Sequence, residues 1–128
     1  MKGKMRILVV DDEAPVAMMI VSLLTRAGFA VTAAHDGDKA IELASETKFD
    51  LITLDVDLPG RDGFDLCREL KQRHISRQTP VVFVSGSAST ENRQWAFELG
   101  AADFITKPFQ PEEFLARIFS QLEETATP

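Results

Sequence analysis

Cysteine is scarce in this sequence. Cys67 is the single cysteine among 128 residues, so no disulfide can form within the chain. A lone thiol fits a reducing compartment, where its usual role is that of a small buried hydrophobic side chain. This excludes the disulfide-rich extracellular scaffolds, and we expect a cytoplasmic protein with Cys67 in its core.

Long apolar stretches are absent as well. No segment approaches the ~20 consecutive apolar residues of a transmembrane helix. The two lysines within residues 1–4 precede an apolar stretch that is too short for the hydrophobic region of a signal peptide. We therefore predict neither a membrane span nor a secretory leader.

The sequence also lacks a basic run. Its formal net charge is -6, and contacts to nucleic-acid phosphates need clustered lysine and arginine, so we predict no direct nucleic-acid binding by this segment. An acidic chain still suits a cation, a basic protein surface, or a phosphoryl group that arrives with its metal. With 45% hydrophobic and 27% charged residues, the composition is that of one soluble globular domain. We place this domain at residues 4–123 and expect residues 124–128 to fray.

Apolar runs alternate with helical patterns along the chain, which is typical of βαβ units. Four of the runs are continuously apolar, which predicts a parallel sheet that helices cover on both faces, with right-handed crossovers. The predicted fold class is therefore α/β, a (βα)5 doubly wound five-stranded sheet. We expect strands at residues 6–10, 29–34, 50–54, 80–84 and 103–106. Helices should begin near Pro15, Asp38, Phe64, Thr90 and Pro111, and residues 57–63 should form a loop.

Polar residues follow four of the predicted strands. Asp11 and Asp12 follow the first, Asp55 the third, Ser85 the fourth and Lys107 the fifth. In an open parallel α/β sheet, ligands bind outside the carboxyl ends of the strands. We therefore expect acids, a hydroxyl group and one lysine to meet at one place.

The three aspartates would crowd their carboxylates into one cleft. At ~4 Å, each like-charge pair repels by about 4 kcal/mol at an effective dielectric constant of ~20. Such a cluster persists only if its pKa values rise or if a cation neutralises it, and Mg²⁺ is a hard cation that takes oxygen ligands. The alternative is that these aspartates are solvated and only cap helices.

The same residues suit phosphoryl transfer, which needs positioning and charge stabilisation more than covalent help from the protein. Asp55 would be the nucleophile and would form an aspartyl phosphate. Lys107 would neutralise phosphoryl oxygens, and Ser85 would donate a hydrogen bond to one of them.

These residues and the fivefold alternation resemble the receiver domain of two-component response regulators, chemotaxis regulators among them. The resemblance covers residues 5–122 and implies the flavodoxin-like strand order 2-1-3-4-5. It rests on four motifs: VVDDE (residues 9–13), DVDLPGRDG (55–63), VSG (84–86) and GAADFITKP (100–108).

The resemblance implies a role for each site residue. Asp55 is the phosphoacceptor and a metal ligand. Asp12 binds Mg²⁺ directly, Asp11 acts through metal-bound water, and the backbone carbonyl of Asp57 completes the protein ligands, with Mn²⁺ as the alternative metal. Lys107 contacts the phosphoryl group, and the bond that joins it to the following proline is expected to be cis.

The resemblance also implies partners and a switch. The phosphodonor is a phosphohistidine on a histidine kinase or a histidine phosphotransfer protein. Ser85 is the switch hydroxyl and Phe104 the switch aromatic. Phosphorylation then changes the face built by the helix at 90–99, the strand at 103–106 and the last helix, which a downstream protein, an effector domain or a second copy of the chain contacts. We assign Arg93, Phe97 and Phe119 to this face.

Five positions depart from the family pattern, among them Gly60 in place of a frequent bulky residue and Phe104 in place of a frequent tyrosine. Ser85 stands where threonine is commoner, which keeps the hydroxyl group but loses a methyl group. Gly86 stands where alanine is common, which predicts a more mobile loop. Asp57 adds a carboxylate beside the phosphoacceptor, and its side chain either steers the hydrolytic water or simply faces solvent.

Three other functions were weighed against a receiver. Asp55-Val56-Asp57 has the DxD spacing of a haloacid-dehalogenase-type phosphatase, but it ends the third strand rather than the first. A receiver used only for docking would not need the complete set of site residues. A flavodoxin-like cofactor binder would carry a glycine-rich phosphate loop where Asp11-Asp12-Glu13 stands. We predict a signalling domain that is not a conventional enzyme but catalyses its own Mg²⁺-dependent phosphorylation and dephosphorylation.

Overall fold

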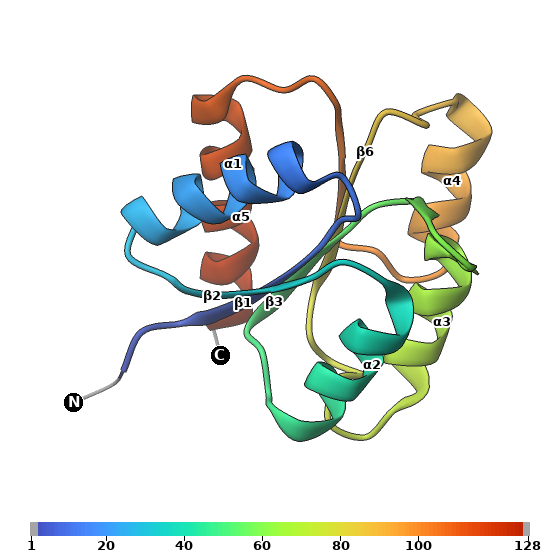
Figure 1. Cartoon of the computed structure of the whole chain (residues 1–128), viewed down its shortest axis with the longest axis horizontal. Helices are drawn as coiled ribbons and strands as arrows, with labels where there is room; N and C mark the ends of the chain where they lie inside the picture. Colours follow the sequence, from blue (N-terminus) through green and yellow to red (C-terminus); the bar gives the residue numbers. More distant parts are fainter. Residues whose placement is uncertain (1–2, 127–128) are drawn as a thin grey trace.

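A single parallel sheet organises the chain (Figure 1). A computed structural model describes residues 3–126, with side chains up to Glu123. The sheet contains β1 (Arg6–Val10), β2 (Ala30–Ala34), β3 (Leu51–Leu54), β6 (Val81–Ser85) and β7 (Asp103–Thr106). Its order is β2-β1-β3-β6-β7, which is the predicted order 2-1-3-4-5 when the strands of this sheet are counted along the chain. The predicted fold class is confirmed.

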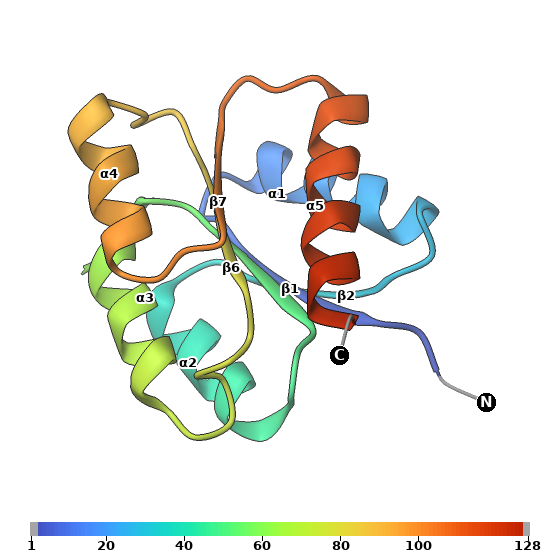
Figure 2. The same cartoon turned by 180° about the vertical axis from the view of Figure 1, so that it is seen from behind.

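Five helices cover the two faces of the sheet. One face carries α1 (Ala14–Arg26) and α5 (Pro111–Ala126), as Figure 2 shows from behind. The other carries α2 (Gly37–Glu46), α3 (Gly63–Gln72) and α4 (Thr90–Glu98). Both faces being covered explains why four of the strands contain continuous apolar runs, whereas the edge strand β2 alternates between exposed and less exposed residues.

Two hydrophobic clusters form the core, one on each face of the sheet. Because side chains alternate along a strand, Ile7 and Val9 of β1 pack with α1 and α5. Leu8 and Val10 of the same strand join the cluster of the opposite face. Cys67 lies in that second cluster, fully buried, as the sequence predicts.

Local signals set the ends of the helices. The side chain of Asp36 accepts a hydrogen bond from the backbone N–H of Lys39 at 2.8 Å, and Ser89 caps α4 in the same way. Such caps satisfy N–H groups that have no partner within the helix. Gly28 and Gly100 follow α1 and α4 with φ values of 102° and 97°, a conformation that glycine adopts without strain.

Each helix buries only a narrow stripe of side chains. In α1, Ala17, Ile20 and Leu24 are buried, whereas Val16 is only partly buried. In α4, only Ala96 is buried. The large side chains on either side of Ala96, Trp95 and Phe97, are therefore exposed at the surface.

The segment at residues 57–63, which the sequence predicts as a loop, is an ordered hairpin. Asp57 and Leu58 form β4, Arg61 and Asp62 form β5, and the two strands pair antiparallel. The turn between them contains Gly60 with φ of 69°. The loop prediction was wrong because two-residue strands leave no detectable alternation in a sequence.

The last helix continues beyond the predicted end of the domain. α5 extends to Ala126, so the predicted boundary at residue 123 falls inside the helix, and residues 127–128 lie outside the described part. Within residues 3–126, none of the helices combines the length and the apolar character that crossing a bilayer requires.

Candidate functional site

An acidic cleft opens at the carboxyl ends of the strands. It has a volume of about 670 Å³, and residues after β1, β3, β6 and β7 line it. Its polar lining includes Asp12, Asp55, Asp57, Ser87 and Lys107. The predicted meeting of acids and a lysine therefore takes place at this edge of the sheet, but the hydroxyl group that lines the cleft is that of Ser87 and not the predicted one of Ser85.

Three carboxylates converge at the base of the cleft. Asp11, Asp12 and Asp55 each offer an oxygen atom, and these atoms all lie within 4.8 Å of one another. Asp11 is 2% exposed and Asp55 4% exposed, whereas Asp12 faces solvent. Burial raises the pKa of the Asp11 carboxyl group, although hydrogen bonds from Lys107 and from the backbone of Glu13 act in the opposite direction.

Lys107 holds this cluster together. Its Nζ atom donates to Asp11 Oδ2 at 2.7 Å, to Asp55 Oδ2 at 2.9 Å and to Glu13 Oε1 at 3.2 Å. Burial alone would lower the pKa of Lys107, but the hydrogen bonds and charges of Asp11 and Asp55 outweigh burial and raise it. The lysine is therefore a permanent cation in the cleft.

Glu13 is the site residue for which sequence reasoning gave no role. It belongs to the acidic run that follows β1, and this run was the available signal. Because Glu13 also binds Lys107, three carboxylates contact one ammonium group, and the carboxylate of Asp12 lies beside two of them. The donor set is all oxygen and retains excess negative charge, which fits a hard divalent cation.

The backbone after Asp55 turns toward its side chain. The N–H of Asp57 donates to Asp55 Oδ1 at 3.2 Å, while Lys107 holds Oδ2 of the same carboxylate. Both oxygens are thus fixed from opposite sides. Asp57 reaches the rim of the cleft, where a carbonyl ligand to a metal is expected.

Ser85 is fully buried behind the cleft and its Oγ atom accepts a hydrogen bond from the N–H of Ser87 at 3.1 Å. The hydroxyl group of Ser87 in turn donates to the carboxylate of Asp57. Asp57 is exposed, yet its side chain is held by a partner from the neighbouring loop. Ser87 was missed because a serine in a small-residue loop carries no specific signal.

Phe104 lies behind Ser85 in the core. Its ring is 3% exposed and stacks on Phe83 with a centroid distance of 5.8 Å. The guanidinium group of Arg93 lies 5.9 Å from the centre of the Phe104 ring, and its Nη2 atom donates to Thr106 Oγ1 at 2.7 Å. Arg93 therefore bridges α4 and β7 over the aromatic ring.

Phe97 is half exposed on α4, but Phe119 lies elsewhere. The Phe119 ring contacts Phe29, at 5.5 Å between centroids, in the cluster that packs α1 against the sheet. The side of α5 that faces β7 is marked by Arg117, which binds Asp103 and the carbonyl of Phe104. Assigning Phe119 to that side was wrong, because two residues along a helix rotate a side chain by about 200°.

The peptide bond between Lys107 and Pro108 is cis, as the resemblance implies. A family model for the response regulator receiver domain matches residues 7–119. The chain belongs to the response regulator receiver domain family. The receiver domain assignment replaces the phosphatase and flavodoxin-like alternatives.

Three solved structures are similar to this receiver domain. The chemotaxis protein CheY4 of Vibrio cholerae is 30% identical with a TM-score of 0.88, and the match covers 92% of this chain and 98% of that one. The receiver domain of a Pseudomonas aeruginosa sensor histidine kinase is 27% identical with a TM-score of 0.86, over 95% and 99%. That structure has a magnesium ion coordinated in its active site cleft. The BeF3-activated receiver domain of RstA from Klebsiella pneumoniae is 35% identical with a TM-score of 0.85, over 91% and 97%.

Proposed function

We propose that this receiver domain accepts a phosphoryl group on Asp55 from a phosphohistidine of a histidine kinase or a histidine phosphotransfer protein. The observation that carries the proposal is the pair of contacts from Lys107 to Asp55 and Asp11, at 2.9 and 2.7 Å. A buried carboxylate beside a permanent cation and further acids is equipped to receive a phosphoryl group and to balance its charge. We place the exchange in the cytoplasm, because the single thiol of Cys67 fits a reducing compartment.

The transfer is a single displacement at phosphorus. A carboxylate oxygen of Asp55 forms the new O–P bond while the P–N bond to the donor histidine breaks, and the electron pair of that bond stays on the imidazole nitrogen. The N–H of Asp57 and the ammonium group of Lys107 hold the Asp55 carboxylate in place for the attack. Lys107 would then redirect one of its three N–H groups, which bind Asp11, Glu13 and Asp55, to an incoming phosphoryl oxygen.

The acidic residues are proposed to hold a divalent cation, Mg²⁺ or as an alternative Mn²⁺. Asp12, Asp55 and the backbone carbonyl of Asp57 would bind it directly, and Asp11 would act through water. When bound, the cation neutralises charge on the phosphoryl oxygens and on the crowded carboxylates. The proximity of three carboxylate oxygens within 4.8 Å supports this assignment, as does the magnesium ion in the similar kinase receiver.

Phosphorylation is proposed to change the face of α4, β7 and α5. Ser85 would donate its hydroxyl group to a phosphoryl oxygen and would then release the N–H of Ser87. Phe104 is already buried, so the change is in its packing against Phe83 and under Arg93 rather than in its exposure. A two-state element of this kind responds to the few hydrogen bonds that a phosphoryl group adds.

The output of the switch is a change in binding at this face. Arg93 and the half-exposed ring of Phe97 lie on α4, and Arg117 continues the face on α5. A downstream protein, an effector domain or a second copy of the chain would bind there. The domain thus acts on no separate substrate, and its catalysis is limited to its own phosphorylation and dephosphorylation.

Labelling with a phosphodonor tests the proposal. Asp55→Asn is expected to abolish incorporation of phosphate from a cognate kinase or from acetyl phosphate, and chelation of Mg²⁺ should do the same. Asp65→Asn is the matched control, because Asp65 lies on the surface of α3, where it pairs with Arg68. Phosphate incorporation that persists in the Asp55→Asn protein would exclude this site.

A further inference from the structure

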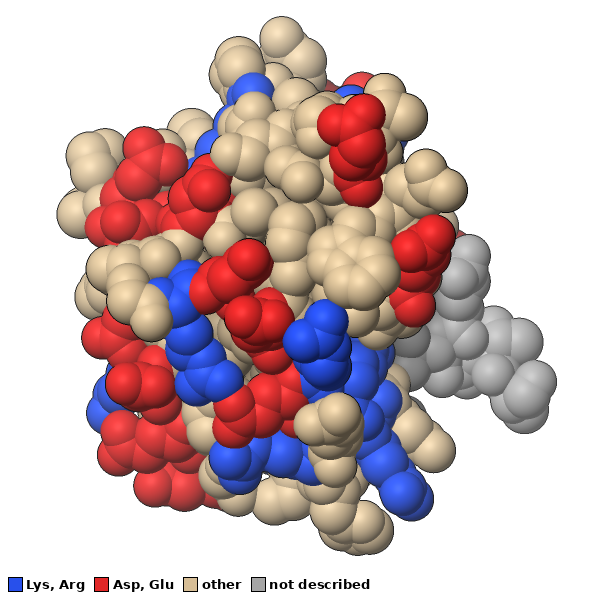
Figure 3. Space-filling view, turned by 90° about the vertical axis from the view of Figure 1, so that its right-hand side faces the viewer, with Lys and Arg blue, Asp and Glu red and all other residues tan. Residues whose placement is uncertain are grey.

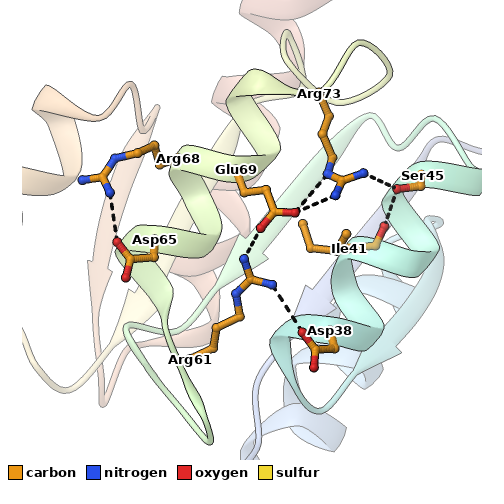
Figure 4. A network of polar contacts seen from close by, with 8 residues as sticks. All are labelled: Asp38, Ile41, Ser45, Arg61, Asp65, Arg68, Glu69 and Arg73. Carbon is orange, nitrogen blue, oxygen red and sulfur yellow. Dashed lines mark hydrogen bonds and ion pairs between the residues drawn. The ribbon is translucent and has the colours of Figure 1, made fainter.

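The side chain of Arg61 fastens the β4–β5 hairpin, which follows Asp55, to two neighbouring helices. Arg61, in β5, donates from Nη2 to Glu69 of α3 and from Nη1 to Asp38 of α2, the latter at 3.3 Å (Figure 4). The side chain of Glu69 is 30% exposed and that of Asp38 is 94% exposed, so the Glu69 contact is the better shielded anchor. Arg61 thereby joins the hairpin to two helices at once.

The aliphatic part (the stem) of the Arg61 side chain packs closely against α2. It passes across the first turn of α2 at Gly37, where a Cβ atom would lie 2.6 Å from the Cδ atom of Arg61. Gly37 is buried although it stands at the start of a helix, because this stem covers it. The arginine is therefore held by packing as well as by charge.

The hairpin connects Arg61 directly to the proposed metal ligand. Arg61 pairs with Leu58 across the hairpin, and Asp57 pairs with Asp62 in the next step of the same ladder. The N–H of Asp57 contacts the Asp55 carboxylate at 3.2 Å. A shift of Arg61 would be transmitted through one antiparallel pair to the backbone of Asp57.

We infer that Arg61 is a positioning residue, which sets the place of the Asp57 backbone in the metal site by fastening the hairpin to α2 and α3. The inference rests on the proposed function, because the Asp57 carbonyl is a metal ligand only within it. On the side of the molecule shown in Figure 3, acidic and basic side chains lie next to one another. The contact between Arg61 and Glu69 belongs to a local network that also includes Arg73.

Glu69 has a second partner, which provides the control. Arg73 donates to Glu69 Oε2 at 2.6 Å and to Ser45 Oγ of α2 at 3.2 Å, at the end of α3 away from the hairpin. Hydrogen bonds from Arg73 and then Arg61 lower the pKa of the Glu69 carboxyl group, so it is ionised at neutral pH. Removing Arg73 weakens the same α2–α3 contact without touching the hairpin.

The test is the Mg²⁺ affinity of the full chain, measured by isothermal titration calorimetry on the unphosphorylated protein. Arg61→Met keeps an apolar stem over Gly37 and removes the charge. We expect it to bind Mg²⁺ about tenfold more weakly than the wild type, at the low end of what outer partners of metal ligands give. Arg73→Met is expected to bind Mg²⁺ like the wild type.

Arg61→Lys extends the test if Arg61→Met does not fold. A lysine keeps one charge but cannot bind Glu69 and Asp38 together, so the Arg61→Lys protein should bind Mg²⁺ more weakly than the wild type and than Arg73→Met. Thermal unfolding without Mg²⁺ separates positioning from stability, because Arg73→Met should lower the melting temperature with no loss of Mg²⁺ affinity. Wild-type affinity in every folded Arg61 variant would overturn the inference alone. A wild-type protein that binds no Mg²⁺ would overturn the proposed metal site together with it.

Discussion

The Nζ atom of Lys107 lies 2.9 Å from Asp55 Oδ2, although the two residues are 52 positions apart in the sequence. The contact joins the ends of β3 and β7, which are not neighbours in the sheet. The lysine side chain extends past the end of β6 into the acidic cleft. A divalent cation bound in this cleft would compete with Lys107 for the carboxylate oxygens of Asp11 and Asp55. This competition leads to the first prediction.

Lys107→Ala should bind Mg²⁺ more tightly than the wild type. The variant removes a permanent positive charge beside the proposed metal site, so we expect affinity to rise about tenfold. Phosphate labelling of Asp55 should persist, but the partner response should no longer follow it. Calorimetric titration with Mg²⁺ measures the first effect, and Lys39→Ala, on the outer surface of α2, is the control. An unchanged partner response in Lys107→Ala would contradict the assigned role.

Ser87→Ala should shorten the lifetime of the aspartyl phosphate several-fold. The variant frees the carboxylate of Asp57, which Ser87 now holds across the rim of the cleft, and a free carboxylate there can accept a proton from the attacking water. Loss of label after removal of the phosphodonor gives the lifetime. Adding Asp57→Ala to Ser87→Ala should restore it. Equal lifetimes in all three proteins would mean that Asp57 takes no part in hydrolysis.

Phe97→Ala should reduce binding at the face of α4, β7 and α5 while leaving stability within about 0.5 kcal/mol of the wild type, because the ring is 50% exposed. Analytical ultracentrifugation and partner pull-down, with and without beryllofluoride, measure the binding. Phe119→Ala is the control on the opposite side of α5. It should lower stability by about 1 kcal/mol through the lost contact with Phe29 and leave binding unaltered.

The stability of the protein should depend on Glu69 in a pH-dependent manner. Arg73 and Arg61 lower the pKa of Glu69 in the folded state, so the carboxylate stabilises the fold above its unfolded pKa of 4.5, and this contribution is lost as the pH falls through the lower folded value. Glu69→Gln should therefore be less stable than the wild type by about 1 kcal/mol at pH 7. Urea unfolding from pH 7 to pH 3 should show the difference shrinking below pH 4.5. A difference that stays constant over this range would argue against an ionic role.

The elements and the main site residues could be predicted from the sequence because the topology of a parallel sheet determines where the ends of its strands lie. Once five apolar runs are recognised as parallel strands, Asp11, Asp55, Ser85 and Lys107 must reach the same edge of the sheet, whatever the loops do. The metal and phosphoryl roles of these residues stay predictions. The contacts of Lys107 establish that Asp11, Asp55 and Lys107 lie together, and Ser85 is buried behind the cleft.

The remaining contacts could not be predicted, because they depend on side-chain direction and loop conformation. The bond from Ser87 to Asp57 joins two loops that the sequence leaves unplaced. The sequence indicated that Phe119 lies outside the buried stripe of α5. It did not indicate whether the ring points toward β7 or, as the structure has it, toward Phe29. Arg61 was passed over because its partners lie on two other elements and no local spacing marks them.

Gly63 fixes the base of the hairpin that follows Asp55. A Cβ atom at this position would lie 2.2 Å from the backbone oxygen of Asp55, so the first turn of α3 packs directly against the backbone of Asp55. At the tip of the hairpin, Pro59 and Gly60 are exposed. A change of sequence or length there can alter what approaches the cleft from outside while Asp55 keeps its place.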